Sequence, residues 1–128
     1  MAHTPVHSDQ APRAIGPYSQ GVSAPAGRLT FVSGQIALDP RTGELLAGDV
    51  TAQTERVMEN LGAVLRAASL GFQDVVRCTI FLTDLSEFAA VNAVYGRYFP
   101  GAPPARVTVQ VSALPRGARV EIDAIAVG

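Results

Sequence analysis

The chain has 128 residues, of which 48% are hydrophobic and 16% are charged, and its formal net charge at pH 7 is -1. This length predicts one domain, and the composition is typical of a globular protein and excludes a disordered one. A net charge so close to zero offers no electrostatic attraction for nucleic acid or for an anionic membrane surface.

The residue types that are missing narrow the possible chemistry. All ten cationic side chains of fixed charge are arginines, which excludes a Schiff-base lysine and the lysine of a phosphate-binding loop. The two histidines, His3 and His7, lie near the N-terminus, so we expect neither a metal nor another cofactor in the body of the domain. The single Cys78 is expected to pack in the core and favours a reducing, cytoplasmic compartment. No apolar run approaches the ~18 residues of a membrane-spanning helix.

The first half of the chain predicts a tail, short strands and one helix. Residues 1–12 are polar and read as a flexible tail, and residues 17–38 predict short strands joined by glycine and proline turns. A loop over residues 39–49 leads to a helix over residues 50–71, which Asp49 can cap. The apolar residues of this helix recur at spacings of three and four, and they are Val57, Met58, Leu61, Val64, Leu65 and Ala68.

The second half alternates strands and one further helix. We expect a strand over residues 73–84, an amphipathic helix over 85–100, and two closing strands over 103–111 and 119–127. Residues 112–118 are suited to a hairpin connection between the last two strands. The result is a single α+β domain with a mixed sheet of five or six strands. Two helices can cover only one face of such a sheet, so the other face is left for a partner.

The strand over residues 103–111 begins with a permanent cation. Its polar side carries Arg106, Thr108 and Gln110, and the polar side of the last strand carries Glu121 and Asp123. In a hairpin these five side chains would share the uncovered face of the sheet. One interpretation is a surface cross-strand ion pair. The other is that Arg106 binds a substrate carboxylate in two-point fashion, while Glu121 orients or deprotonates a water molecule.

Several long segments resemble the RidA (YjgF-type) family of reactive-intermediate deaminases. The segments are "IGPYSQGV" (15–22), "VSGQIALDPRTGEL" (32–45), residues 52–69 of the expected helix, "DVVRCTIFLTDLSEFAAVNAVYGRYF" (74–99) and "PPARVTVQVSALPRGARVEIDAIAV" (103–127). The resemblance implies one chorismate-mutase-like domain over the whole chain and a homotrimer with its sheets packed inward. It also implies clefts at the subunit interfaces, in which 2-iminobutanoate, 2-iminopropanoate and their enamine tautomers are hydrolysed to 2-oxo acids and ammonia.

The resemblance also assigns roles to residues of this chain. Arg106 matches the family's carboxylate-binding arginine, Glu121 the acidic residue near the attacking water, and Tyr18 a catalytic tyrosine contributed across the interface. The substrate-binding set implied by the resemblance is Arg106, Ser33, Gly34, Asn92 and Thr108. Thr108 departs from the family pattern, because many members carry cysteine at this position.

Other functions remain open at this point. A trimer that binds metabolites without turnover, as a chaperone or sensor, would use the same clefts. A sibling deaminase acting on another carbon–nitrogen substrate is a second possibility. Ribonuclease activity, also associated with the family, is disfavoured by the net charge and by the absence of a basic run.

Overall fold

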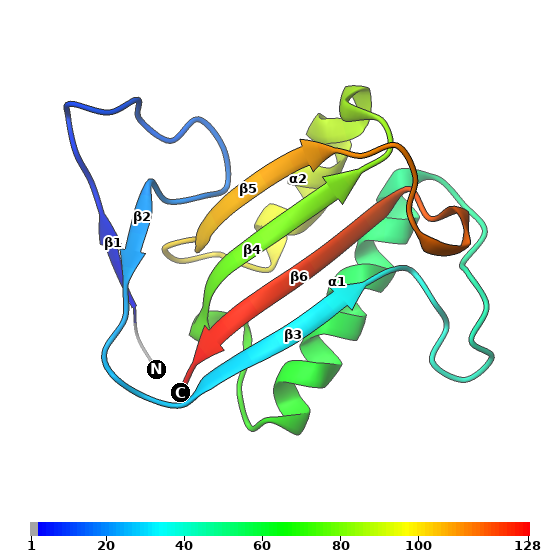
Figure 1. The fold of residues 1–128 in the computed structure, drawn as a ribbon, viewed down its shortest axis with the longest axis horizontal. Coiled ribbons are helices and arrows are strands. Elements are labelled where there is room, and N and C mark those ends of the chain that lie inside the picture. The colour runs from blue at the N-terminus through cyan, green and yellow to red at the C-terminus, as the bar shows by residue number, and fades with distance from the viewer. Residues whose placement is uncertain (1–2) are drawn as a thin grey trace.

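A computed structural model of the chain describes residues 3–128, and Figure 1 shows its arrangement. In chain order the strands and helices are β1 (Thr4–Val6), β2 (Gly21–Ser23), β3 (Leu29–Gln35), α1 (Val50–Ala67), β4 (Val75–Leu82), α2 (Phe88–Arg97), β5 (Ala105–Gln110) and β6 (Val120–Val127). Neither described helix is long and apolar enough to cross a membrane.

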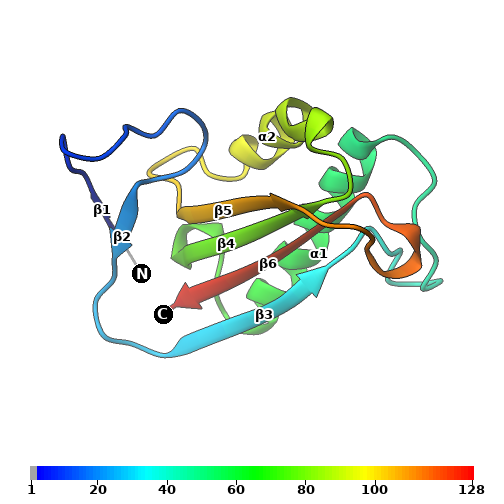
Figure 2. The same cartoon turned by 45° about the horizontal axis from the view of Figure 1, so that its top comes forward.

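The six strands divide between a four-stranded sheet and a two-stranded ribbon. The main sheet has the strand order β3-β6-β4-β5, with β4 and β5 parallel and the other neighbours antiparallel. The ribbon pairs β1 with β2. Both helices lie on one face of the main sheet and leave the other face open (Figures 1 and 2). The predicted mixed sheet with two helices on one face is therefore confirmed.

The predicted hairpin between the last two strands is wrong. Strand β6 lies between β3 and β4, whereas β5 lies on the far side of β4, at the edge of the sheet. Strands β4 and β5 are joined through α2, and a helical crossover of this kind connects parallel neighbours. The connection after β5 then passes across the end of β4 before β6 begins. This topology changes which side chains share a face.

The hydrophobic core lies between the helices and the main sheet. Val57, Met58, Leu61 and Leu65 of α1 are all 1% exposed or less, as their spacing predicts. Val64, which the same spacing placed in the core, is 39% exposed at the rim. From the sheet, the core takes every second residue of the two central strands, including Cys78, Ile80, Leu82, Val120 and Ile122. Helix α1 ends at Ala67, before the predicted end, and two residues later Ser69 adopts a φ of 61°.

The N-terminal segment expected as a tail contains strand β1. Its path is fixed by the side chain of Gln20, which accepts a hydrogen bond from the backbone N–H of Ser8 at 2.7 Å and donates to the carbonyl of Pro12 at 2.6 Å. Residues 1 and 2 of the expected tail lie outside the described residues. The segment from His3 onward therefore packs beside the residues that precede β5, where His3 contacts the carbonyl of Ala102, instead of leaving the domain.

The start of α1 tests whether its cap stabilises the domain. Asp49 has extended backbone angles, and its carboxylate accepts a hydrogen bond from the backbone N–H of Ala52 at 2.9 Å. Asp49→Ala removes this acceptor and should lower the free energy of unfolding by about 1 kcal/mol. Asp49→Asn keeps an acceptor and should unfold nearly as the native chain does. Urea unfolding at one fixed protein concentration measures both variants; equal midpoints for the two would contradict the capping role.

Candidate functional site

The position of Arg106 follows from the parallel pairing of β5. Arg106 stands opposite Cys78 of β4, and Cys78 is buried under the helices. Because paired residues of neighbouring strands point to the same face, the Arg106 side chain also points to the helix side. Two prolines precede β5, and the backbone N–H of Ser19 donates to the carbonyl of Pro104 at 3.2 Å. The strand start is thus held against the segment of the same chain that carries Tyr18, a residue that the family resemblance had assigned across the subunit interface.

Three aromatic rings and one amide surround the Arg106 guanidinium. Its Cζ lies between 5.2 and 5.5 Å from three ring centroids, which belong to Tyr18, Phe88 and Tyr95. The side-chain oxygen of Asn92 accepts a hydrogen bond from Nη1 at 2.7 Å. Arginine over aromatic faces is a favourable cation–π arrangement. We call these four residues the arginine cradle. It fixes the direction of a half-buried cation.

The arginine cradle contains no carboxylate. Among residues 3–128, no acidic side chain forms an ion pair with Arg106. Burial lowers the pKa of Arg106, but an arginine remains charged throughout the physiological range. A half-buried permanent charge without an anionic partner is costly, so the cradle is suited to receive an anion, for which guanidinium offers two parallel donors.

Glu121 and Asp123 do not share a face with Arg106, contrary to the sequence prediction. Glu121 stands opposite Phe81 of β4, between Val120 and Ile122, which are both buried under the helices. It therefore points to the uncovered face. The prediction failed because it assumed a hairpin between β5 and β6. Asp123 lies on the same open face, where its carboxylate accepts a hydrogen bond from the backbone N–H of Thr79 at 2.8 Å.

Glu121 lies directly over Gly34. A Cβ atom at position 34 would lie 2.8 Å from Cδ and 3.0 Å from Cγ of Glu121, so a residue with a side chain would displace the carboxylate. The pairing of β3 with β6 is irregular between Val32 and Gln35, which places Ser33 and Gly34 in a bulge. The structure thus brings Glu121, Ser33 and Gly34 together, apart from the arginine cradle of the same chain.

The remaining site residue, Thr108, lies two positions after Arg106 on the same side of β5. Its hydroxyl oxygen is buried and has no hydrogen-bond partner among residues 3–128. Buried hydroxyls normally have a hydrogen-bond partner, and a bound polar group could supply one to this hydroxyl.

Phe88 and Tyr95 were not among the site residues predicted from the sequence. The sequence could have indicated them, because Phe88, Asn92 and Tyr95 follow the i, i+4, i+7 spacing of one helix face, and Asn92 was already a candidate.

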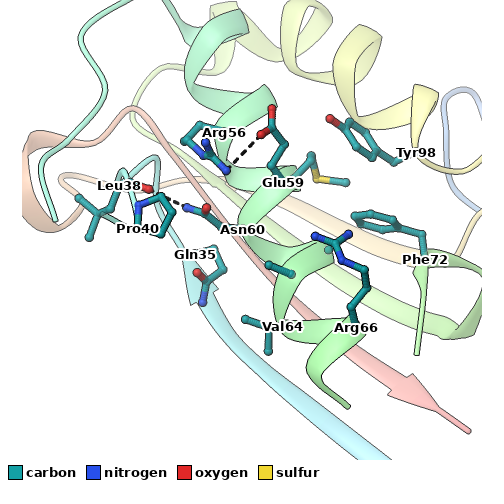
Figure 3. Close-up of a pocket in the computed structure, with 13 residues that line it drawn as sticks. Gln35, Leu38, Pro40, Arg56, Glu59, Asn60, Val64, Arg66, Phe72 and Tyr98 are labelled. Carbon is teal, nitrogen blue, oxygen red and sulfur yellow. Dashed lines mark hydrogen bonds and ion pairs between the residues drawn. The ribbon is translucent and has the colours of Figure 1, made fainter. Parts of the chain in front are cut away.

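The two halves of the predicted site therefore lie on opposite faces of one sheet. The uncovered face also exposes large apolar side chains, since Phe31 is 70% exposed, Val107 42% and Val109 37%. Apolar surface of this kind marks an interaction surface. Neither Arg106 nor Glu121 lines the three cavities of about 440, 640 and 280 Å³, although Tyr18 of the arginine cradle lines the third. Figure 3 shows the first of these, which follows the outer side of α1.

Residues 3–128 contain no cluster of three or more histidine, cysteine or acidic side chains arranged to hold a metal ion. His7 pairs with Asp9 at 2.9 Å near the N-terminus, and Cys78 is buried in the core. The candidate site residues offer guanidinium, carboxylate, hydroxyl, amide and backbone groups.

Comparison with known proteins places this arrangement in one class. A family model described as Endoribonuclease L-PSP matches residues 8–128. Relatives and solved structures of the same kind include RidA and YjgF proteins, and the chain belongs to this RidA (YjgF-type) family.

Individual relatives extend over nearly the whole chain. Protein DfrA of Myxococcus xanthus is 72% identical over 127 residues, which cover 99% of this chain and 97% of that protein. The 2-iminobutanoate/2-iminopropanoate deaminase of Mus musculus is 48% identical over 122 residues, covering 95% of this chain and 89% of that protein. A crystal structure of E. coli TdcF with bound serine has a TM-score of 0.75 and 42% identity, covering 98% of both chains.

The buried thiol behind the cradle gives a pH-dependent prediction. Burial raises the pKa of Cys78 from its ordinary value of 9.0 to about 12. Between these values the folded chain holds a proton that the unfolded chain has lost, so stability falls as the pH rises through this window. Between pH 8 and pH 10 the native chain should lose roughly 1 kcal/mol more stability than Cys78→Ala. Denaturant unfolding at both pH values measures this difference; parallel losses would contradict the shift.

Proposed function

We propose that this protein is a cytoplasmic imine deaminase that hydrolyses 2-iminobutanoate and 2-iminopropanoate to 2-oxo acids and ammonia. The proposal is supported by family membership and by relatives 46–48% identical that are named for this activity. It is further supported by Arg106, which lies in the arginine cradle without an anionic partner among residues 3–128 and is suited to bind a substrate carboxylate. Among the relatives, protein DfrA carries a name that states no reaction, so the substrate requires a direct test.

We further propose that each cleft is built by two copies of the chain in a homotrimer. One observation carries this proposal: Arg106 and Glu121 point to opposite faces of the same sheet, so a single copy cannot present both to one small substrate. Strand β5 is an edge strand, and the open face beside it exposes Val107 and Val109. If a neighbouring copy packs its open face against this edge, its Glu121 reaches the cradle of the first copy.

In this cleft the substrate carboxylate would pair with Arg106, whose cradle fixes its orientation before binding. Glu121 of the neighbouring copy would hold a water about 3 Å from the imine carbon and favour the protonated imine. The water oxygen adds to the carbon as Glu121 takes one proton, giving a carbinolamine. Glu121 returns this proton to nitrogen, the carbon–nitrogen bond breaks, and the hydroxyl proton leaves with ammonia as ammonium. The balance is protonated imine plus water to 2-oxo acid plus ammonium.

The other site residues would orient substrate and water. The buried hydroxyl of Thr108 would bond to the substrate carboxylate or nitrogen, which would satisfy an otherwise unpaired group. Ser33 and the backbone of Gly34 would line the wall that carries Glu121. Tyr18 and Asn92 would act through Arg106, which they contact directly. No metal or other cofactor has a step in this scheme.

Substitution of the two charged residues tests the chemistry. Arg106→Lys keeps a charge but loses the planar two-point contact, so it should lower the rate of imine hydrolysis about 30- to 1000-fold, as should Arg106→Ala. Glu121→Gln keeps the shape without the base and should lower kcat more than it raises KM. The assay follows 2-oxo acid formation from imines generated in situ.

Matched controls separate chemistry from stability in this experiment. Arg97→Ala removes an exposed arginine of the same helix layer that lies outside the proposed site, and it should keep the native rate. Melting temperatures identify variants that fail to fold. Native rates in Arg106→Ala would overturn the deaminase proposal. Substrate binding without turnover in the native protein would favour a metabolite-binding role instead.

Mixing two inactive variants tests the shared cleft. Arg106→Ala and Glu121→Gln subunits are refolded together, so that trimers assemble at random. A cleft between copies then receives both native residues in about a quarter of cases, and about a quarter of the native rate should return. A cleft within one copy would regain nothing, because neither chain carries both residues. Absence of recovered activity in demonstrably mixed trimers would overturn the shared cleft.

A further inference from the structure

The largest of the three cavities lies at one end of the helix layer and has no part in the proposed reaction. It measures about 640 Å³ and lies between the end of α1, the turn that leads into β4, and the loop that follows α2. Its walls are formed by Arg66, Phe72, Tyr98 and Phe99, with Pro100 and His3 at the border. This volume is typical of sites for small organic ligands.

The body of this cavity is aromatic. The ring centroids of Phe72 and Tyr98 lie 5.1 Å apart, and the ring of Phe72 meets that of Phe99 edge-on at 5.6 Å. Gly62 of α1 allows the first of these rings to approach, because a Cβ at position 62 would lie 3.0 Å from Phe72. The rings therefore form fixed apolar walls for the body of a ligand.

Arg66 supplies a cation at the edge of the aromatic walls. It stands in the last turn of α1, and among residues 3–128 it has no ion pair or hydrogen-bond partner for its side chain. A Cβ at Gly62 would lie 3.3 Å from its Nη1, so the side chain folds back along the helix. Figure 3 is drawn around the neighbouring 440 Å³ cavity, which Arg66 also lines, and it shows the Arg66 guanidinium beside the ring of Phe72.

His3 adds a second polar group with unused hydrogen-bonding capacity. Its Nε2 lies 3.1 Å from the carbonyl oxygen of Ala102, and since a carbonyl only accepts, Nε2 carries the proton. The other ring nitrogen, Nδ1, is buried and has no partner among the described residues. Buried ring nitrogens are normally paired, so this one is an exception within the part of the chain that the structure describes.

We propose that this cavity binds a small carboxylic acid with an aromatic or compact apolar body. The rings would hold the body, and Arg66 would pair with the carboxylate. Among residues 3–128, no acidic side chain lines the cavity, and Arg66 is the permanent cation in its lining. Binding of one acid suits the one cation, and the cavity volume lies in the range of small-molecule sites. The site is separate from the arginine cradle and does not depend on the proposed reaction.

A pair of matched probes tests this assignment. 3-Phenylpropanoate carries the charge, whereas 3-phenylpropanamide has the same body without it. Both are titrated into the native protein by calorimetry and by amide chemical-shift mapping. Because Arg106 also suits carboxylates, the titrations are repeated in Arg106→Ala. Arg66→Gln removes the charge from an exposed side chain, and Arg97→Gln is the control, since Arg97 is an exposed arginine that does not line the cavity.

We expect the acid to bind at least tenfold more tightly than the amide and to shift the amides of Gly71, Gln73 and Gly101. Arg66→Gln should weaken acid binding about tenfold, while Arg97→Gln and Arg106→Ala leave it unchanged at this cavity. Gln73→Trp, which places a large side chain at an exposed position of the lining, should also weaken it. Equal affinities for acid and amide, shifts confined to the arginine cradle, or unchanged binding in Arg66→Gln would each overturn the proposal.

Discussion

The parallel pairing of β4 with β5, made through helix α2, determines the rest of this structure. It aligns Arg106 with the buried Cys78 and so directs a permanent cation toward the helices instead of toward the open face. The same crossover brings α2 over the strand, where Phe88, Asn92 and Tyr95 meet the guanidinium. A helix that connects two parallel strands thereby also builds most of the cradle around the side chain that the second strand carries.

This arrangement keeps Arg106 and Glu121 of one chain from neutralising each other. Had Arg106 and Glu121 stood opposite one another on one face, they would have formed an ordinary cross-strand pair, and neither would have been free for a ligand. On opposite faces they remain unpaired with each other. Glu121 is instead held over Gly34, where only a glycine leaves room for it.

Local sequence patterns predicted where the helices and strands lie better than they predicted which strands pair with each other. The three-and-four spacing of Val57, Met58, Leu61 and Leu65 located the core face of α1, and Asp49 marked its start. Alternation of residues along β5 and β6 correctly divided each strand into two sides. It could not say which strand lies beside which, and a short connection suggested a hairpin that the sheet order excludes. The resemblance to a known family supplied the candidate site residues, but the separation of Arg106 from Glu121 required the register of the sheet.

The start of β5 protects this edge of the sheet against pairing with further strands. Edge strands present unpaired backbone groups that invite open-ended sheet growth. Here Pro103 and Pro104 lack the N–H groups that such growth needs, and Ser19 forms a bridge with Ala105 that occupies the first residue of the edge. At the opposite edge, the bulge in β3 interrupts regular pairing. Fibre-like extension through strand pairing is thereby discouraged at both edges of the sheet.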